Sequence, residues 1–225
     1  MKRKTTEEIE EKSPQEMVRE WLHILILAIL LTLLLRAFVF QGYRISNKSM
    51  EDTFRVGDYI IGEKISYKTR LPKPGEIVIF EYPLNPDKIF IKRCVALPGD
   101  TVVIRNKILY INNQPATEYS GVKYTDPELL SAIYSNRDNY GPVIIPADNI
   151  FVIGDNRDNS MDSRFWGPLP VENIQARPLF IYFSIQPDEN TPVWRSPLSI
   201  IPIIIHYITS FPSRIRGNRI GRQIV

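Results

Sequence analysis

The first strong feature of the sequence is a single long apolar run near the N-terminus. Residues 22–40 are about 19 positions dominated by Leu and Ile, and roughly 20 such residues cross the hydrocarbon core of a bilayer. Trp21 lies at one edge of the run, and Arg36 lies near the other, where its long stem can reach the interface. The pattern predicts a transmembrane helix over residues 21–40, after a polar tail over residues 1–20.

Two other structures are compatible with an apolar run of this kind: a helix buried in a protein core and a cleaved signal peptide. A signal peptide has a shorter apolar region and small residues at its cleavage site, and residues 36–40 (RAFVF) contain no A-x-A pattern. We therefore expect an uncleaved anchor. Five Lys/Arg precede the run and three follow it in residues 41–60, which favours a cytoplasmic N-terminus and an extracytoplasmic main domain.

Short apolar segments separated by polar, Pro- or Gly-containing turns follow the anchor. Gly57 and Asp58 predict a turn before a strand at 59–61, and residues 102–104 and 108–111 read as a hairpin around Asn106-Lys107. Further strands are expected at 149–153 and 174–185. With 18 prolines and 11% aromatic residues, the pattern favours a β-rich domain over a helical bundle.

The C-terminal part, residues 188–225, is expected to comprise a polar connector, a short apolar segment and a basic tail. Residues 198–207 are apolar but short, and Pro202 interrupts them, so we expect them to lie on a membrane surface or pack on the domain; a second crossing is the alternative. The tail from Arg214 carries four arginines and no acidic residue, which suggests contact with lipid headgroups.

Composition excludes several classes of protein. The net charge of +3 is too small to indicate a nucleic-acid partner. One cysteine and two histidines exclude an intramolecular disulfide framework and a Cys/His zinc cluster, and no metal or organic cofactor is expected. His23 and His206 lie in apolar stretches, which disfavours a Ser-His-Asp triad. Cys94 is expected to be a small buried residue in a strand.

The densest run of hydrogen-bonding and turn-forming side chains is residues 154–170, GDNRDNSMDSRFWGPLP. Asn and Asp side chains bond to nearby backbone and resist regular structure, and a generic loop of this kind is usually a surface loop. This string, however, resembles the last signature box of the bacterial type I signal peptidases, which are membrane-bound Ser/Lys proteases. Seventeen residues with almost no deviation make the resemblance specific.

Three other stretches resemble boxes of the same family. Lys92-Arg93 followed by LPGD resembles the box with the general base, and VGDYIIGEK (56–64) resembles a weaker second box. Ser49, Met50 and Thr53 keep the register of the nucleophile box. The sequence departs from that box at Ser46, Asn47 and Asp52, where the family usually has proline, serine and proline.

The resemblance implies a fold: mainly β, an antiparallel β catalytic domain with a smaller β insertion, tethered by one N-terminal transmembrane helix. The catalytic domain would span residues 41–187, with the variable insertion at about 102–146. The protein is expected to be a single-pass protein of the cell (inner) membrane, in contact with the lipid bilayer, and a monomer.

The resemblance also implies roles for individual residues. Ser49 would be the nucleophile and Lys92 the general base, because burial can lower the pKa of a lysine enough to leave its amine neutral and able to accept a proton. Ser160 would orient Lys92. The oxyanion would be bound by the Ser49 N–H and the Asn47 side chain, and Asp155, Asp162 and Arg164 would support the site. The family residues that line the shallow substrate pocket correspond to Ile45, Met50, Phe54 and Ile91.

The expected function is removal of N-terminal signal peptides from exported preproteins after small residues (A-x-A). Two alternatives are weighed against it. A self-cleaving repressor-type protease shares Ser/Lys chemistry, but it is soluble and carries a DNA-binding domain. A catalytically inactive, membrane-tethered binding or scaffold protein would account for the departures at Ser46, Asn47 and Asp52, but not for the retention of Ser49, Lys92 and Ser160 together.

Overall fold

The computed structural model describes residues 13–188 and 200–224, which fall into two units, Met1–Val39 and Phe40–Val225. The first unit contains helix α1 (Pro14–Phe38). Ser13 and Glu16 form a reciprocal capping box at its start, as the sequence Ser-Pro-x-Glu suggests. With a mean hydropathy of 2.3 and no buried residue, α1 is long and apolar enough to cross a membrane. It ends two residues earlier than expected, because Phe40 already belongs to a strand.

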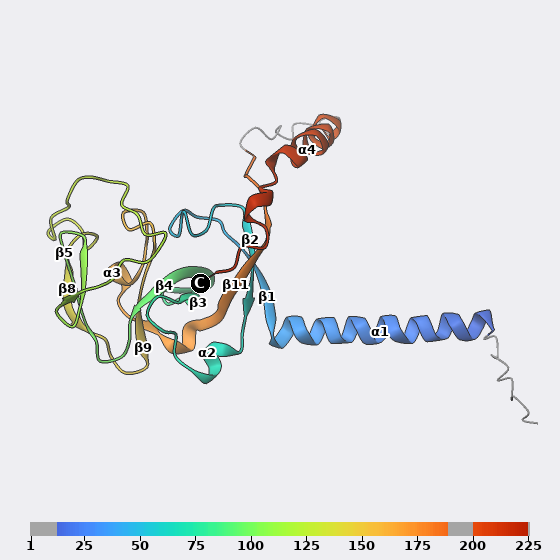
Figure 1. Ribbon diagram of the computed structural model, residues 1–225, viewed down its shortest axis with the longest axis horizontal. Coiled ribbons are helices and arrows are strands. Elements are labelled where there is room, and N and C mark those ends of the chain that lie inside the picture. Colours follow the sequence, from blue (N-terminus) through green and yellow to red (C-terminus); the bar gives the residue numbers. More distant parts are fainter. Residues whose placement is uncertain (1–12, 189–199, 225) are drawn as a thin grey trace, which may run out of the picture. The chain divides into compact units, whose positions relative to one another are not determined.

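The second unit is built on an antiparallel sheet with strand order β1-β2-β11-β3-β4-β9-β10 (Figure 1). Short helices α2 (Ser66–Thr69) and α3 (Ser163–Trp166) and a turn of 3-10 helix, η1 (Val171–Asn173), connect its strands. The strands are β1 (Phe40–Arg44), β2 (Asp58–Glu63), β3 (Ile77–Tyr82), β4 (Asn85–Ala96), β9 (Asn149–Ile153), β10 (Leu169–Pro170) and β11 (Ile174–Ser184).

A second antiparallel sheet has the order β7-β6-β5-β8, and its strands lie in the expected insertion apart from Thr101. Its strands are β5 (Thr101–Arg105), β6 (Ile108–Ile111), β7 (Gln114–Pro115) and β8 (Tyr140–Ile144). β5 and β6 form the predicted hairpin, and Asn106 and Lys107 between them both have positive φ, as a tight two-residue hairpin turn requires. The mainly β, antiparallel fold with a smaller β insertion is therefore confirmed.

The hydrophobic core lies in three buried clusters that follow the alternation of the strands. Ile60 of β2, Ile79 of β3 and Ile181 of β11 share one cluster beside the nucleophile loop. The second cluster joins the two sheets through Val102 and Phe151. The third contains Cys94, which is completely buried and whose thiol pKa is raised by burial to about 12, in agreement with its expected structural role.

The C-terminal region is a helix followed by a segment that returns to the main sheet. Helix α4 (Ile200–Arg214) covers most of the predicted apolar segment; residues 198 and 199 lie outside the described part of the chain. After it, η3 (Gly217–Arg219) leads to backbone hydrogen bonds between Gly221 and Ile181 and between Ile224 and Leu179. The end of the chain is thus attached along β11.

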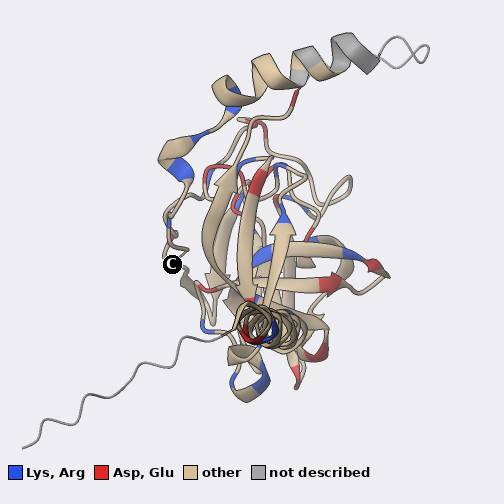
Figure 2. Ribbon diagram, turned by 90° about the vertical axis from the view of Figure 1, so that its right-hand side faces the viewer, with Lys and Arg blue, Asp and Glu red and all other residues tan. Residues whose placement is uncertain are grey.

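The expectation that the basic tail meets lipid headgroups is wrong for three of its four arginines. Arg216 and Arg219 pair with the buried carboxylate of Asp58, at 3.3 and 2.6 Å, and Arg214 pairs with Asp188 at 2.6 Å. Figure 2 shows several Lys/Arg positions, in blue, along the part of the chain that leads to the C-terminus. Asp58 is at the start of β2 and offers a stronger, desolvated partner than a headgroup in water.

Candidate active site

Ser49 and Lys92 come together although 43 positions separate them in the sequence. Ser49 lies in the loop between β1 and β2, which is fixed at its base by hydrogen bonds between Ile45 and Asp58 and between Gly57 and Ile45. Lys92 is in the middle of β4, opposite Val78 of β3. The Lys92 Nζ donates to Ser49 Oγ at 2.5 Å. A nucleophile and its base need this hydrogen-bond contact.

The Lys92 amine is almost completely removed from water. Its side chain is 2% exposed, and its nitrogen lies 5.3 Å from the centre of the Phe90 ring. Burial lowers the pKa of Lys92 to about 8, while the charges of Asp162 and Asp155 limit the decrease. Neither of these carboxylates is bonded to the amine among the described contacts. A useful fraction of Lys92 is therefore neutral near physiological pH, as a general base must be.

Arg93, the next residue on β4, is buried on the other side of the strand. Its guanidinium donates two hydrogen bonds to Asp155, at 2.8 and 2.7 Å, and one to the carbonyl of Gly75. Asp155 also accepts the Thr53 hydroxyl at 2.6 Å. The predicted support role of Asp155 thus takes the form of an Arg93–Asp155–Thr53 chain that joins β4, the signature loop and the nucleophile loop.

Asn47 does not have the geometry expected of an oxyanion donor in this conformation. Its Oδ1 accepts hydrogen bonds from both the backbone N–H of Ser49, at 3.1 Å, and the Ser49 hydroxyl, at 2.8 Å. The N–H that would bind an oxyanion is therefore occupied by the Asn47 carbonyl. An amide has an acceptor and a donor end, so the Asn47 side chain has to turn before either group can bind an oxyanion.

Ser160 is close to the site, but it does not form the expected hydrogen bond to Lys92. Its hydroxyl is buried and interacts with the Asp162 carboxylate, which helps to lower the pKa of Asp162, while Lys92 donates to Ser49. A Cβ on Gly154 would lie 2.2 Å from the Ser160 Oγ and 2.6 Å from the Ser49 carbonyl oxygen. Only glycine permits this close approach between the signature loop and the nucleophile loop.

Asp162 and Arg164 form the ion pair that the sequence predicted. Arg164 donates to both carboxylate oxygens of Asp162 at 2.8 Å, and both side chains are buried. Burial alone would raise the pKa of Asp162, but the charge and hydrogen bonds of Arg164 outweigh it and lower this pKa. The second Asp162 oxygen also accepts the N–H of Gly154 at 3.0 Å, so the pair fixes the loop that carries Ser160.

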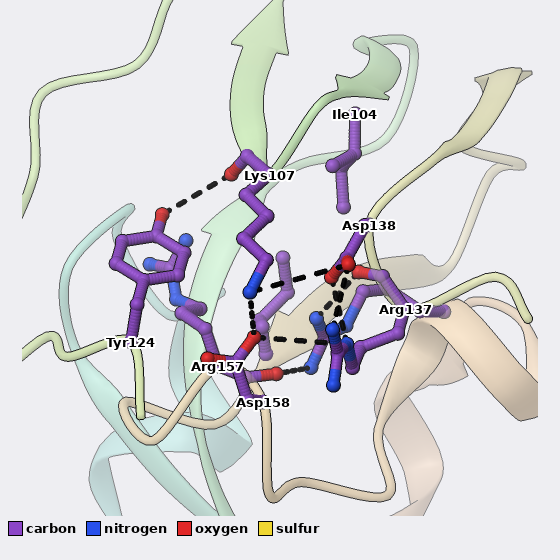
Figure 3. Close-up of a pocket in the computed structure, with 9 residues that line it drawn as sticks. Ile104, Lys107, Tyr124, Arg137, Asp138, Arg157 and Asp158 are labelled. Atoms are coloured by element: carbon purple, nitrogen blue, oxygen red, sulfur yellow. Dashed lines mark hydrogen bonds and ion pairs between the residues drawn. The ribbon is translucent and has the colours of Figure 1, made fainter. Parts of the chain in front are cut away.

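A network of charges between the signature loop and the insertion extends this support (Figure 3). Lys107 pairs with Asp158 at 2.8 Å, and Arg137 pairs with Asp138 at 2.8 Å. Arg164 closes the network by donating to the carbonyl of Arg137. The hairpin of the second sheet is therefore tied by side chains to the loop beside the candidate site.

Asp52, one of the departures from the family, has an explanation in the local backbone. Its φ is +79°, whereas proline is held near −65°, so this loop could not carry the usual proline. Asp tolerates the left-handed region better than most residues, and its carboxylate pairs with Lys123 at 3.2 Å. Lys123 also pairs with Glu51 at 3.1 Å. This contact attaches residues of the insertion to the nucleophile loop.

Three of the four expected substrate-pocket residues line a small hollow beside Ser49, of about 30 Å³. Ile45, Met50 and Ile91 belong to its wall together with Ile89, which the sequence did not indicate. We call this hollow the Ile45 pocket. Phe54 is different: it is fully buried in the core cluster and packs behind the pocket. The prediction that Phe54 contacts substrate is corrected to a supporting position, since its side chain has no free surface.

A buried lysine bonded to a serine hydroxyl, beside a small apolar pocket, defines the site of a serine hydrolase. Comparison with known proteins agrees with this class. The profile of the family described as "Signal peptidase, peptidase S26" matches residues 18–183. The chain therefore belongs to the S26 family of signal peptidases, which are serine peptidases.

Individual relatives are similar over most of their length. The chain is 32% identical to signal peptidase I of Aquifex aeolicus, with 89% of this chain and 96% of that protein covered. It is 37% identical to the probable signal peptidase I-1 of Synechocystis, over 76% and 85%. A crystal structure of a signal peptidase I from Enterococcus faecalis is 30% identical and covers 48% of this chain and 97% of that one, with a TM-score of 0.35.

Proposed function

We propose that this protein is a membrane-bound endopeptidase that removes signal peptides by Ser/Lys chemistry, with Ser49 as nucleophile and Lys92 as general base. Family membership supports the removal of signal peptides. The single observation that supports the chemistry is the 2.5 Å contact between a desolvated lysine and a serine hydroxyl. No other arrangement of nucleophile and base is needed to explain the site.

In the first step, Lys92 takes the proton of the Ser49 hydroxyl as Oγ bonds to the scissile carbonyl carbon. The C–N bond then breaks, and Lys92 returns the proton to the leaving amine. Water hydrolyses the acyl-enzyme with Lys92 again as the base. Acylation and deacylation each begin with a neutral Lys92 amine that accepts a proton, and its lowered pKa of about 8 makes that neutral form accessible near neutral pH.

The oxyanion is proposed to be bound after a rotation of Asn47. Turning its amide would free the Ser49 N–H, and could direct Nδ2 at the developing charge. Ser160 would bond to Lys92 once the Ser49 hydroxyl is consumed, because its own hydroxyl is buried where the signature loop meets the nucleophile loop. Both movements are side-chain rotations that require no change in the backbone.

Specificity for small residues before the bond is proposed to follow from the Ile45 pocket. A volume of about 30 Å³, walled by Ile45, Met50 and Ile91, accommodates an alanine methyl group better than a larger side chain. The substrate residues that precede the scissile bond would lie in an extended conformation beside residues 43–47 of the enzyme. The helix α1 would anchor the enzyme in the bilayer with the N-terminus in the cytoplasm, as its flanking charges favour.

The test is cleavage of a preprotein with an Ala-x-Ala site by the detergent-solubilised protein, by Ser49→Ala and by Lys92→Ala. The proposal expects cleavage after the second alanine by the unsubstituted protein alone, with both variants folded. Cleavage by Ser49→Ala at the normal rate would remove the nucleophile assignment.

The second candidate function, a catalytically inactive binding protein, is favoured by one observation: Asn47 blocks the Ser49 N–H. The two candidates differ in whether Ser49 reacts. A mechanism-based acylating inhibitor would label Ser49 in an enzyme. Absence of labelling in folded protein would favour the binding protein.

A further inference from the structure

Two hollows meet at Ser49, and only one of them is the Ile45 pocket. The other, of about 240 Å³, lies on the side of Lys92. We call it the Met161 cavity. Asn47 and Ser49 line both hollows, but Lys92 lines only the second. The full lining of the Met161 cavity is Asn47, Lys48, Ser49, Phe90, Lys92, Asn159 and Met161.

The position of Lys92 decides which part of a substrate each hollow receives. Proton balance requires the base to give the proton taken from Ser49 to the nitrogen of the leaving amine. That nitrogen must therefore lie near Lys92 Nζ, and the residues attached to it must continue on the same side. The acyl part of the substrate, bonded to Ser49 Oγ, must lie on the other side, toward the Ile45 pocket.

We propose that the Met161 cavity binds the first residues of the mature protein, immediately after the scissile bond. This inference rests on the proposed function of the Ser49–Lys92 site. It assigns Met161 and Phe90 as contacts of the first mature residue and Lys48 as a contact of a nearby acidic side chain. These residues determine specificity on the side of the bond that the Ile45 pocket does not reach.

Size and surface distinguish the cavity from the Ile45 pocket. Its volume is about 240 Å³ against about 30 Å³, so it accepts large side chains where the other accepts small ones. Phe90 forms a fixed wall, because it stacks on Tyr82 with ring centres 4.6 Å apart. Met161 is half-exposed at 52% and forms the opposite, adaptable wall. A substrate side chain in the cavity would cover part of the exposed surface of Met161.

The rim of the cavity carries one charge of defined sign. Lys48, directly before the nucleophile, is exposed and lines the cavity with the amide of Asn159. A cation at this position attracts a carboxylate and repels another cation, with a strength that decreases as salt increases. Substrates with an acidic residue just after the bond should therefore be cleaved faster than those with a basic one.

The experiment measures kcat/KM for quenched peptides with a fixed Ala-x-Ala segment and Ala, Phe, Glu or Lys as the first residue after the bond. The full chain is used in detergent, as the unsubstituted protein, Met161→Trp and Lys48→Glu. Lys68→Glu on the exposed helix α2 is the charge-matched control outside the cavity. A second set of peptides varies the residue before the bond, Ala or Leu.

For peptides that differ in the first residue after the scissile bond, Met161→Trp should lower the ratio of kcat/KM for Phe to that for Ala about tenfold, because the added ring fills the cavity. For peptides that differ in the residue before the bond, the ratio of kcat/KM for Ala to that for Leu should stay unchanged. Lys48→Glu should reverse the Glu/Lys preference, and Lys68→Glu should not. Ratios are insensitive to a general loss of activity, so a displaced Ser160 loop cannot imitate the result.

Two failures have different meanings. If the unsubstituted protein cleaves the peptides but Met161→Trp and Lys48→Glu leave every ratio after the bond unchanged, or change only the ratio before the bond, the assignment of the cavity is overturned and the proposed function stands. If folded, unsubstituted protein cleaves none of the peptides, the proposed function is overturned together with the assignment.

Discussion

Lys92 and Arg93 are adjacent on β4 and equally buried, but their surroundings are opposite. Arg93 faces Asp155 and forms two hydrogen bonds with it, so its charge is balanced. Lys92 faces Phe90 and the hydroxyl of Ser49, and has no bonded carboxylate among the described contacts. Successive residues of a strand point to opposite faces, so one strand provides both environments.

The burial of Arg93 on one face of β4 stabilises the structure, whereas the burial of Lys92 on the other face favours the chemistry. A buried cation that is paired fixes its surroundings, and removing its partner is costly. A buried amine that is not paired is easier to deprotonate. If Lys92 had a carboxylate partner like that of Arg93, its pKa would not be lowered and it would not act as a base.

The largest effect is expected from Lys92→Arg. A guanidinium keeps its charge and cannot accept the Ser49 proton, so preprotein cleavage should decrease about 10²–10⁴-fold, the usual contribution of general acid–base catalysis. Lys68→Arg on α2 is the matched control and should have normal activity. Substantial turnover by Lys92→Arg would show that Lys92 is not the general base, and that the two faces of β4 do not differ in the way described.

The next largest effect is on stability, from Asp155→Ala. The substitution leaves Arg93 buried without its carboxylate, which should lower the free energy of unfolding by about 3–5 kcal/mol. Chemical denaturation would measure it, with Asp87→Ala at an exposed position of β4 as the control. A loss of unfolding free energy no larger than that of Asp87→Ala would mean that the Arg93–Asp155 pair does not stabilise the fold.

A smaller loss of stability is expected from Arg219→Gln. Asp58 would lose its charged hydrogen bonds from Arg219 but keep Arg216 and the Ser184 hydroxyl, so the cost should be about 1.5–3 kcal/mol. Arg222→Gln, at an exposed position of the same tail, is the control. Equal stabilities of the two variants would contradict the buried role of the tail.

The smallest effect is expected from Lys123→Ala. Its ion pairs with Glu51 and Asp52 are partly exposed, with side chains 25%, 32% and 52% accessible, and such pairs contribute about 0–1 kcal/mol. Thermal unfolding should show little change. A loss comparable to that of Asp155→Ala would show that the insertion holds the nucleophile loop more firmly than this geometry indicates.

The sequence predicted the fold class and the residues that meet at the site, because motif resemblance carries information about contacts between distant segments. It could not predict what individual side chains bond to. Arg93 and Arg219 find buried carboxylates 62 and 161 positions away, and nothing in their local sequence marks those partners. The orientation of Asn47 depends on one side-chain rotation, and the burial of Phe54 depends on packing from several strands.

Lys92 can act as a general base because burial without a bonded carboxylate lowers its pKa and favours the neutral amine. The most direct measurement is the pH dependence of kcat/KM for an Ala-x-Ala peptide, from pH 6 to 10. Burial lowers the Lys92 pKa to about 8, so activity should increase with pH as the amine loses its proton and level off above that value. A rising limb near 10.4, the value of a solvated lysine, or a rate independent of pH would contradict the account.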